Sequence, residues 1–202
     1  MHIRVFCRRV TAWSRAALAF AALMSVAPAV AQPVDRIGVP GPLSLGGVDH
    51  ALAWSAQPSA RYYKQEYLPA GQATKTYTRM VMIEVIESGA TVNSALAAQV
   101  KMLNERKRKD PLVNMAITRN EKTGEVLLDF ILGGRDATGR DIAEWNVYRY
   151  VPFRQGVMLF AVSLRAYGDD AIMDFLADLK SKRPREISTV AQHPLPTVVL
   201  RK

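Results

Sequence analysis

Cysteine and histidine are scarce in this 202-residue chain. Cys7 is the only cysteine, and beyond the first 31 residues the histidines are His50 and His193. A chain without cysteine after residue 7 forms no disulfide there and offers no thiolate as a nucleophile or zinc ligand. His50 and His193 lie far apart in the sequence, so their spacing indicates no metal site. We therefore expect neither a metal ion nor a cofactor.

Motifs of common catalytic sites are missing as well. The chain has no G-x-S-x-G sequence, which is the nucleophile turn of many serine hydrolases. Residues 134–139 have the span of a phosphate-binding loop, but Arg140 and Asp141 stand where Lys and Ser or Thr are required, so we expect a hairpin turn. The basic run at 101–109 is typical of the last turns of a helix, where cations complement the dipole. We expect no nucleic-acid partner.

The first 31 residues have the pattern of a secretory signal. The first 15 residues contain four arginines and no acidic residue, and a largely apolar run over 16–26 follows them. Ala29 and Ala31 then occupy the A-x-A positions of a cleavage site. The alternative is an uncleaved anchor, but residues 16–31 are shorter than the roughly 20 needed to span a bilayer. We expect cleavage before Gln32 and no transmembrane segment afterwards. The export predicts a periplasmic location, and secretion to the medium remains open.

The rest of the chain alternates strand-like and helix-like patterns. Residues 32–42 carry three prolines and two glycines, which predicts a flexible leader. Two or three short strands and the run 77–86 come next, and Thr91 can cap a helix that runs to about Lys109. Four strand-like runs joined by short turns follow, and then a helix that Pro184 ends. Residues 184–202 are expected to form a C-terminal tail.

This order predicts a single α+β domain over 43–183. We expect one antiparallel sheet of about six to seven strands with two main helices packed on it. The layout from Leu43 to Arg183 resembles the PsbP-like fold of photosystem II extrinsic subunits and of small secreted bacterial proteins. That resemblance rests on the order of the elements, and it implies an accessory or binding role without enzymatic activity.

Charged and aromatic side chains inside the strand patterns are the candidate functional residues. Four charged residues interrupt strand patterns in which apolar residues alternate: Glu84, Asp129, Glu144 and Arg149. A charge at such a position must either pair with an opposite charge or face an open cleft. Structural pairs would explain them. A binding cleft rimmed by aromatics and arginine would also explain them, because these side chains are enriched at binding surfaces. The candidate binding residues are Trp54, Tyr62, Glu144, Asn146, Tyr148, Arg149, Tyr150 and Arg165.

The strand that contains Trp145 predicts how such a cleft is arranged. Alternation places Trp145 and Val147 on one face, toward the core, and Tyr148 and Tyr150 on the other, beside Glu144. We therefore expect a periplasmic module that binds an unidentified protein or small molecule. The alternative is a glycan hydrolase that uses two of Glu84, Asp129 and Glu144, although no pair of carboxylates has a distinctive spacing.

Overall fold

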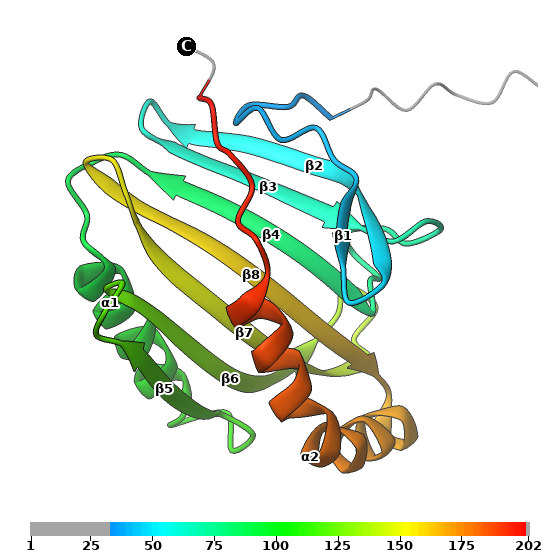
Figure 1. Ribbon diagram of the computed structural model, residues 1–202. Coiled ribbons are helices and arrows are strands. Elements are labelled where there is room, and N and C mark those ends of the chain that lie inside the picture. Colours follow the sequence, from blue (N-terminus) through cyan, green and yellow to red (C-terminus); the bar gives the residue numbers. More distant parts are fainter. Residues whose placement is uncertain (1–32, 201–202) are drawn as a thin grey trace, which may run out of the picture. The chain divides into compact units, whose positions relative to one another are not determined.

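The computed structural model of the protein describes residues 33–200. The expected signal segment and its cleavage site before Gln32 lie outside these residues. Strands and helices occupy most of the described chain (Figure 1). In chain order they are β1 (Leu43–Leu45), β2 (Val48–Ser59), β3 (Tyr62–Leu68), β4 (Arg79–Ile86), α1 (Val92–Arg106), β5 (Asn114–Asn120), β6 (Glu125–Arg135), β7 (Asp141–Phe153), β8 (Gly156–Tyr167) and α2 (Asp169–Gln192).

The strands form one antiparallel sheet of eight, in the order β1-β2-β3-β4-β8-β7-β6-β5. Each half of the sheet is a meander, because β1 to β4 and β5 to β8 pair in sequence order, through short turns except for the ten-residue loop between β3 and β4. The halves meet where β4 pairs with β8, with Ile83 opposite Phe160. This pairing brings residues from before and after α1 side by side at the centre of the sheet.

The expected sheet of six to seven strands is wrong. All eight strand-like runs join one sheet, and strand residues clearly outnumber helical ones. The short N-terminal run is a true edge strand because Gly46 and Gly47 both adopt positive φ and turn the chain back, so that Leu45 lies opposite Val48. Leu43 and Leu45 then bury their side chains in the core.

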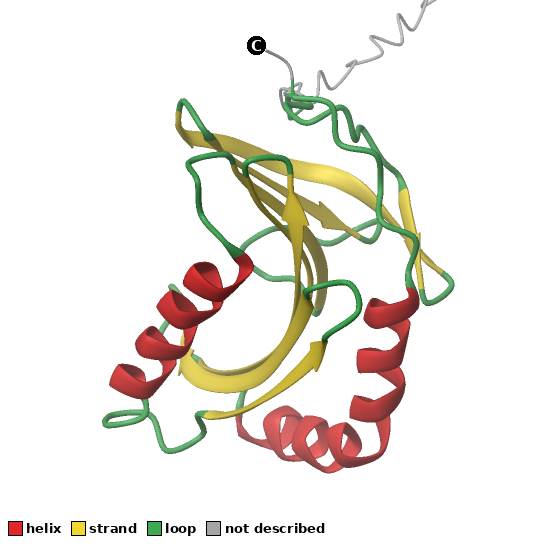
Figure 2. Ribbon diagram, turned by 60° about the vertical axis from the view of Figure 1, so that its left-hand side comes forward, coloured by secondary structure: helices red, strands yellow, loops and turns green. Residues whose placement is uncertain are grey.

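The two helices cover opposite faces of the sheet (Figure 2). On the face that carries α2, Val81, Phe160 and Trp145 belong to one buried apolar cluster. On the face that carries α1, Met82, Leu159 and Leu128 belong to a second. Successive side chains of a strand point to opposite faces, so the period-two patterns in the sequence supply both clusters.

Helix α1 begins at the predicted cap. The hydroxyl of Thr91 accepts a hydrogen bond from the backbone of Ser94, and the Ser94 hydroxyl in turn accepts one from the backbone of Thr91. Val92, Leu96 and Leu103 repeat at helical spacing and are buried against the sheet. The helix ends at Arg106, whose guanidinium pairs with Asp110 at 2.9 Å and also donates to the carbonyl of Gly133.

Helix α2 passes through Pro184 and ends at Gln192, so the expected helix end at Pro184 is wrong. Proline lacks an N–H and clashes with the preceding turn, which bends a helix without always ending it. Figure 2 shows α2 changing direction along its length. Ion pairs hold both segments to the sheet: Arg183 lies 2.6 Å from Asp129, and Arg79 lies 3.0 Å from Glu186.

The segments expected as a flexible leader over 32–42 and as a tail from 184 both pack on the domain. Ile37 and Val39 are buried, and the backbone N–H of Val199 donates to the carbonyl of Ile37 at 2.8 Å. The side chain of Gln65 accepts from the N–H of Arg36 at 2.6 Å and donates to the carbonyl of Val39. Pro40 and Pro42 disfavour regular structure before β1, but they do not prevent burial. Packing against the sheet therefore extends beyond 43–183 on both sides.

Candidate functional site

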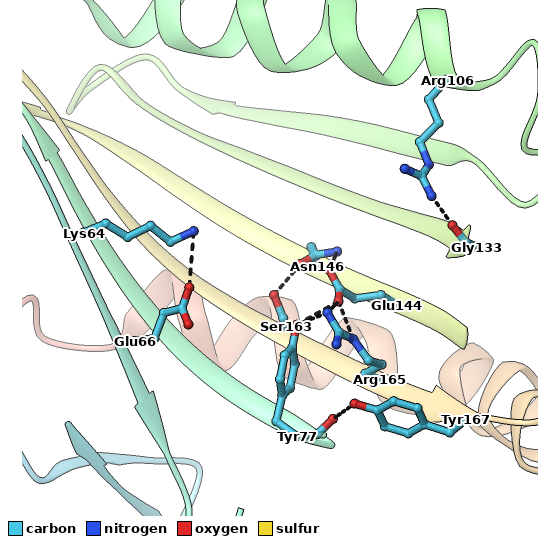
Figure 3. A network of polar contacts seen from close by, with 10 residues as sticks. All are labelled: Lys64, Glu66, Tyr77, Arg106, Gly133, Glu144, Asn146, Ser163, Arg165 and Tyr167. Atoms are coloured by element: carbon cyan, nitrogen blue, oxygen red, sulfur yellow. Dashed lines mark hydrogen bonds and ion pairs between the residues drawn. The ribbon is translucent and has the colours of Figure 1, made fainter. Parts of the chain in front are cut away.

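Polar side chains from neighbouring strands gather on the sheet face that carries α1. Lys64 of β3 lies opposite Glu84 of β4, and Glu144 of β7 lies opposite Arg165 of β8. Residues directly opposite each other in antiparallel strands share a face, so the register places all four side chains on the same side of the sheet. Figure 3 shows the network around Glu144 on β7 and β8, with Lys64 standing apart from it.

A pocket of about 360 Å³ opens between α1 and this face. Its helix side consists of Ala95, Ala98 and Gln99, and its floor includes Leu159. The pocket exists because the two alanines stand where larger side chains would fill the space above the strands. The volume falls within the range of small-molecule sites in proteins. The polar groups at its wall come from Tyr62, Glu84, Gln99, Tyr148 and Tyr150.

Tyr148 and Tyr150 contribute phenol groups to the pocket that are free to bind. Tyr150 is buried, and Tyr148 is half-buried with its ring edge-on to Phe130 at 4.9 Å. Neither hydroxyl forms a hydrogen bond to any group within residues 33–200, yet neither is sealed from solvent. Burial, and then the negative charge of Glu84, raise the pKa of both phenols. Both therefore stay protonated at neutral pH and can donate to or accept from a ligand.

Glu84 is the carboxylate at the pocket wall, and two neighbours hold it. The hydroxyl of Tyr62 donates to its Oε2 at 2.6 Å, and the Nζ of Lys64 lies 3.4 Å from its Oε1. The same ammonium lies 3.3 Å from Glu66. Burial, and then the hydrogen bond to Glu84, raise the pKa of Tyr62. Two carboxylates therefore share one ammonium beside the pocket.

Glu144 is the centre of a separate network on the same face (Figure 3). It accepts from Arg165 Nε at 2.7 Å and from the hydroxyl of Tyr77 at 2.7 Å. Asn146 donates to it at 3.2 Å and accepts a hydrogen bond from Ser163. The Arg165 guanidinium also stacks on the Tyr77 ring at 4.1 Å. These contacts engage the polar groups with one another, so this network fixes the loop before β4 to the sheet.

Of the eight candidate binding residues, Tyr62, Tyr148 and Tyr150 line the pocket, whereas Glu144, Asn146 and Arg165 form the separate network and the other two lie elsewhere. Arg149 lies on the opposite face, where it pairs with Glu125 at 3.0 Å and donates to the carbonyls of Val190 and His193. It therefore clamps the C-terminal end of α2 to β6 and β7. Trp54 lies on the face of the pocket, opposite Glu66, but out on β2 with 40% of its surface exposed. It does not line the pocket.

The geometry does not support a carboxylate pair for hydrolysis among the three expected acids. Asp129 lies on the α2 face, bound to Arg183. Glu84 is level with Tyr150 of β7, so it lies six positions along that strand from Glu144, roughly 20 Å. Glycoside hydrolases need about 5 to 10 Å.

His50 and His193, the histidines within residues 33–200, each pack against other parts of the domain. His50 is buried, with Nδ1 3.1 Å from the carbonyl of Leu43, and His193 stacks on Phe160. Within residues 33–200 no three His, Cys, Asp or Glu side chains gather as a metal ion would need. Over the same residues, no helix has the length and apolar character that crossing a membrane requires.

The sequence reasoning missed the helix side of the pocket. Ala95, Ala98 and Gln99 carry no chemistry that attracts attention in a sequence, and Lys64 lies on a strand that was treated only as structure. The small side chains at 95 and 98, one helical turn apart, were the available signal. Such a pair on the inner face of a helix indicates space above the sheet.

Two comparisons with known proteins address the family of this chain. The comparison with curated proteins gave no match. A protein-family model matches residues 37–195. The matched span includes all eight strands and both helices, and therefore the pocket and the Glu144 network. Because it covers well over half of the chain, the protein belongs to that family.

Proposed function

We propose that the protein is a periplasmic binding module that holds a small molecule, without a cofactor, in the pocket between α1 and the sheet. The observation that carries this proposal is the pair of phenol hydroxyls, on Tyr148 and Tyr150, that face the pocket without a hydrogen-bond partner within residues 33–200. The protein does not bond these hydroxyls at the pocket wall, so a bound molecule can replace water as their partner. A ligand is the natural partner for hydroxyls held at the wall of a pocket of this size.

The apolar lining defines the rest of the ligand. Ile86, Val157 and Leu159 line the pocket together with the two alanines of α1. A compact molecule with an apolar body and one or two polar groups fits such a lining. The export signal pattern and the cysteine-free remainder of the chain support a periplasmic location. The PsbP-like resemblance remains a prediction.

The proposal is tested by filling the pocket. N-phenyl-1-naphthylamine is an uncharged dye that fluoresces in apolar sites, and we expect the wild-type protein to bind one equivalent. Ala98→Leu places a larger side chain at the pocket wall and should weaken dye binding at least tenfold. Ala97→Leu is the matched control, because both alanines are exposed on α1 but only Ala98 lines the pocket.

Both substitutions exchange one good helix former for another, so melting temperatures should stay close to that of the wild type. Dye binding that Ala98→Leu leaves unchanged would overturn the assignment of the ligand to this pocket. Absence of dye binding to the wild-type protein would overturn it as well. Loss of binding in both variants would show that α1 matters for some reason other than the space beneath it.

A further inference from the structure

Three tyrosines line the pocket. Tyr62 comes from β3, and Tyr148 and Tyr150 come from β7. The ring centroids of Tyr148 and Tyr150 lie 6.2 Å apart, with an angle of 69° between the ring planes. In this edge-to-face pair the edge of one ring meets one face of the other, so the two rings leave their remaining faces clear of each other. A cation that stacks on such a face within about 6 Å of the centroid makes a cation–π contact.

The one charged side chain that lines the pocket is acidic. Glu84 lines it, and no Lys, Arg or His is among its lining residues. Glu84 and Glu66 share the single ammonium of Lys64, which leaves one net negative charge. Of the other charges on this face, Glu144 is balanced by Arg165, and the guanidinium of Arg119 donates to Asn93 of α1 at 3.0 Å.

Beyond the effect of burial, the negative charge of Glu84 contributes to the raised pKa of Tyr148 and Tyr150. Burial is the main cause of the raised pKa of Tyr148, and Glu84 and Glu144 raise it further. Burial and then Glu84 raise the pKa of Tyr150 in the same way. A site whose neighbouring charges oppose a phenolate also opposes an anionic ligand, and it favours a cation.

We propose that the pocket selects a positively charged organic amine, an ammonium group on a small apolar body. This inference rests on the proposed function and specifies its ligand class. Three phenol rings supply cation–π contact, and the Glu66–Lys64–Glu84 cluster supplies the compensating charge. The free oxygens of Tyr148 and Tyr150 can accept from an N–H of a primary or secondary amine.

Two molecules of nearly the same shape isolate the effect of charge. Choline carries a trimethylammonium group, and 3,3-dimethylbutan-1-ol replaces that group with an uncharged tert-butyl group. We expect choline to bind the wild-type protein at least tenfold more tightly, as measured by titration followed by NMR. Equal affinity for the two probes, tighter binding of the alcohol, or no binding of choline would overturn the inference.

A charge-neutral variant gives the second test. Glu84→Gln keeps a hydrogen-bond acceptor for Tyr62 and leaves Lys64 paired with Glu66, so the net negative charge disappears. Choline affinity should fall at least fivefold, and affinity for the alcohol should stay within twofold. Glu121→Gln, an exposed change on the turn between β5 and β6, should alter neither. Equal losses in the two glutamine variants would overturn the role of Glu84.

The outcomes separate this inference from the proposed function. If Ala98→Leu blocks the uncharged dye while choline shows no advantage over the alcohol, the pocket is a ligand site and the ligand class is wrong. If Ala98→Leu has no effect on the dye and choline still binds preferentially, the cation site lies elsewhere. In that case both conclusions about the pocket are wrong.

Discussion

Removing single tyrosine hydroxyls should show which of them the fold already uses. Tyr67 and Tyr150 are both buried, with 0% and 5% of their surface exposed. The hydroxyl of Tyr67 donates to the carbonyl of Val39 at 2.7 Å and accepts from Gln65 Nε2 at 2.6 Å. The hydroxyl of Tyr150 has no hydrogen-bond partner in the part of the chain that the structure describes.

The expected losses of stability differ accordingly. A net hydrogen bond contributes about 0.5 to 1.5 kcal/mol to stability, so Tyr67→Phe, which loses two, should cost about 1 to 3 kcal/mol. Tyr150→Phe loses none and keeps the ring in the α1 core, so its free energy of unfolding should stay within about 0.5 kcal/mol of the wild type. Tyr148→Phe should behave like Tyr150→Phe.

Urea denaturation followed by circular dichroism measures these differences, provided that the slope m stays constant among the variants. The same three variants can be titrated with the naphthylamine dye. A loss at Tyr150→Phe as large as that at Tyr67→Phe would refute the reasoning, because it would mean that the Tyr150 hydroxyl is bonded in the folded protein. That hydroxyl would then be unavailable to a ligand.

Three further substitutions test the account of the fold. Arg149→Ala removes the clamp on α2 and leaves Glu125 half-buried without its partner, so it should cost about 2 to 3 kcal/mol in urea denaturation; a loss below about 0.5 kcal/mol would contradict the clamp. Burial lowers the pKa of His50 from 6.5, so below that pH the unfolded chain binds a proton that the folded protein excludes, and stability should fall by up to about 1.4 kcal/mol per pH unit. His50→Gln should flatten this loss between pH 6.5 and 5.5, and an unchanged slope would assign it to other groups. Gly156→Ala would place a Cβ 1.8 Å from the carbonyl oxygen of Ile86 and should cost about 3 kcal/mol or more, so a variant with the wild-type melting temperature would show that this backbone contact relaxes easily.

The strand faces were predictable from the sequence, because alternation along one strand depends on that strand alone. The expected opposition of Trp145 and Val147 to Tyr148 and Tyr150 is present: the first two belong to the α2 cluster and the second two lie against α1. The same alternation places Arg149 on the α2 face, away from the other candidates. Arg149 was counted among the binding residues because of its residue type, although its position in the strand already placed it on the other face.

The pocket was not predictable in the same way. Tyr62 and Tyr150 share it only because β4 and β8 alone separate β3 from β7, in a register that only the folded sheet sets. The space above them depends on where α1 lies. Proline content also gave wrong predictions at the two ends of the domain. Helix α2 continues through Pro184 instead of ending there. The proline-rich segment before β1 packs on the domain and buries Ile37.

The central claim, that the pocket under α1 is a ligand site, is tested most directly by NMR of protein labelled with ¹³C at the ε carbons of its seven tyrosines. Resonances can be assigned from single Tyr→Phe variants and followed during titration with N-phenyl-1-naphthylamine. The account predicts that the signals of Tyr62, Tyr148 and Tyr150 shift together and saturate at one equivalent, while that of Tyr67, on the opposite face, stays in place. Saturable binding that moves Tyr67 and leaves Tyr148 and Tyr150 unchanged would contradict it.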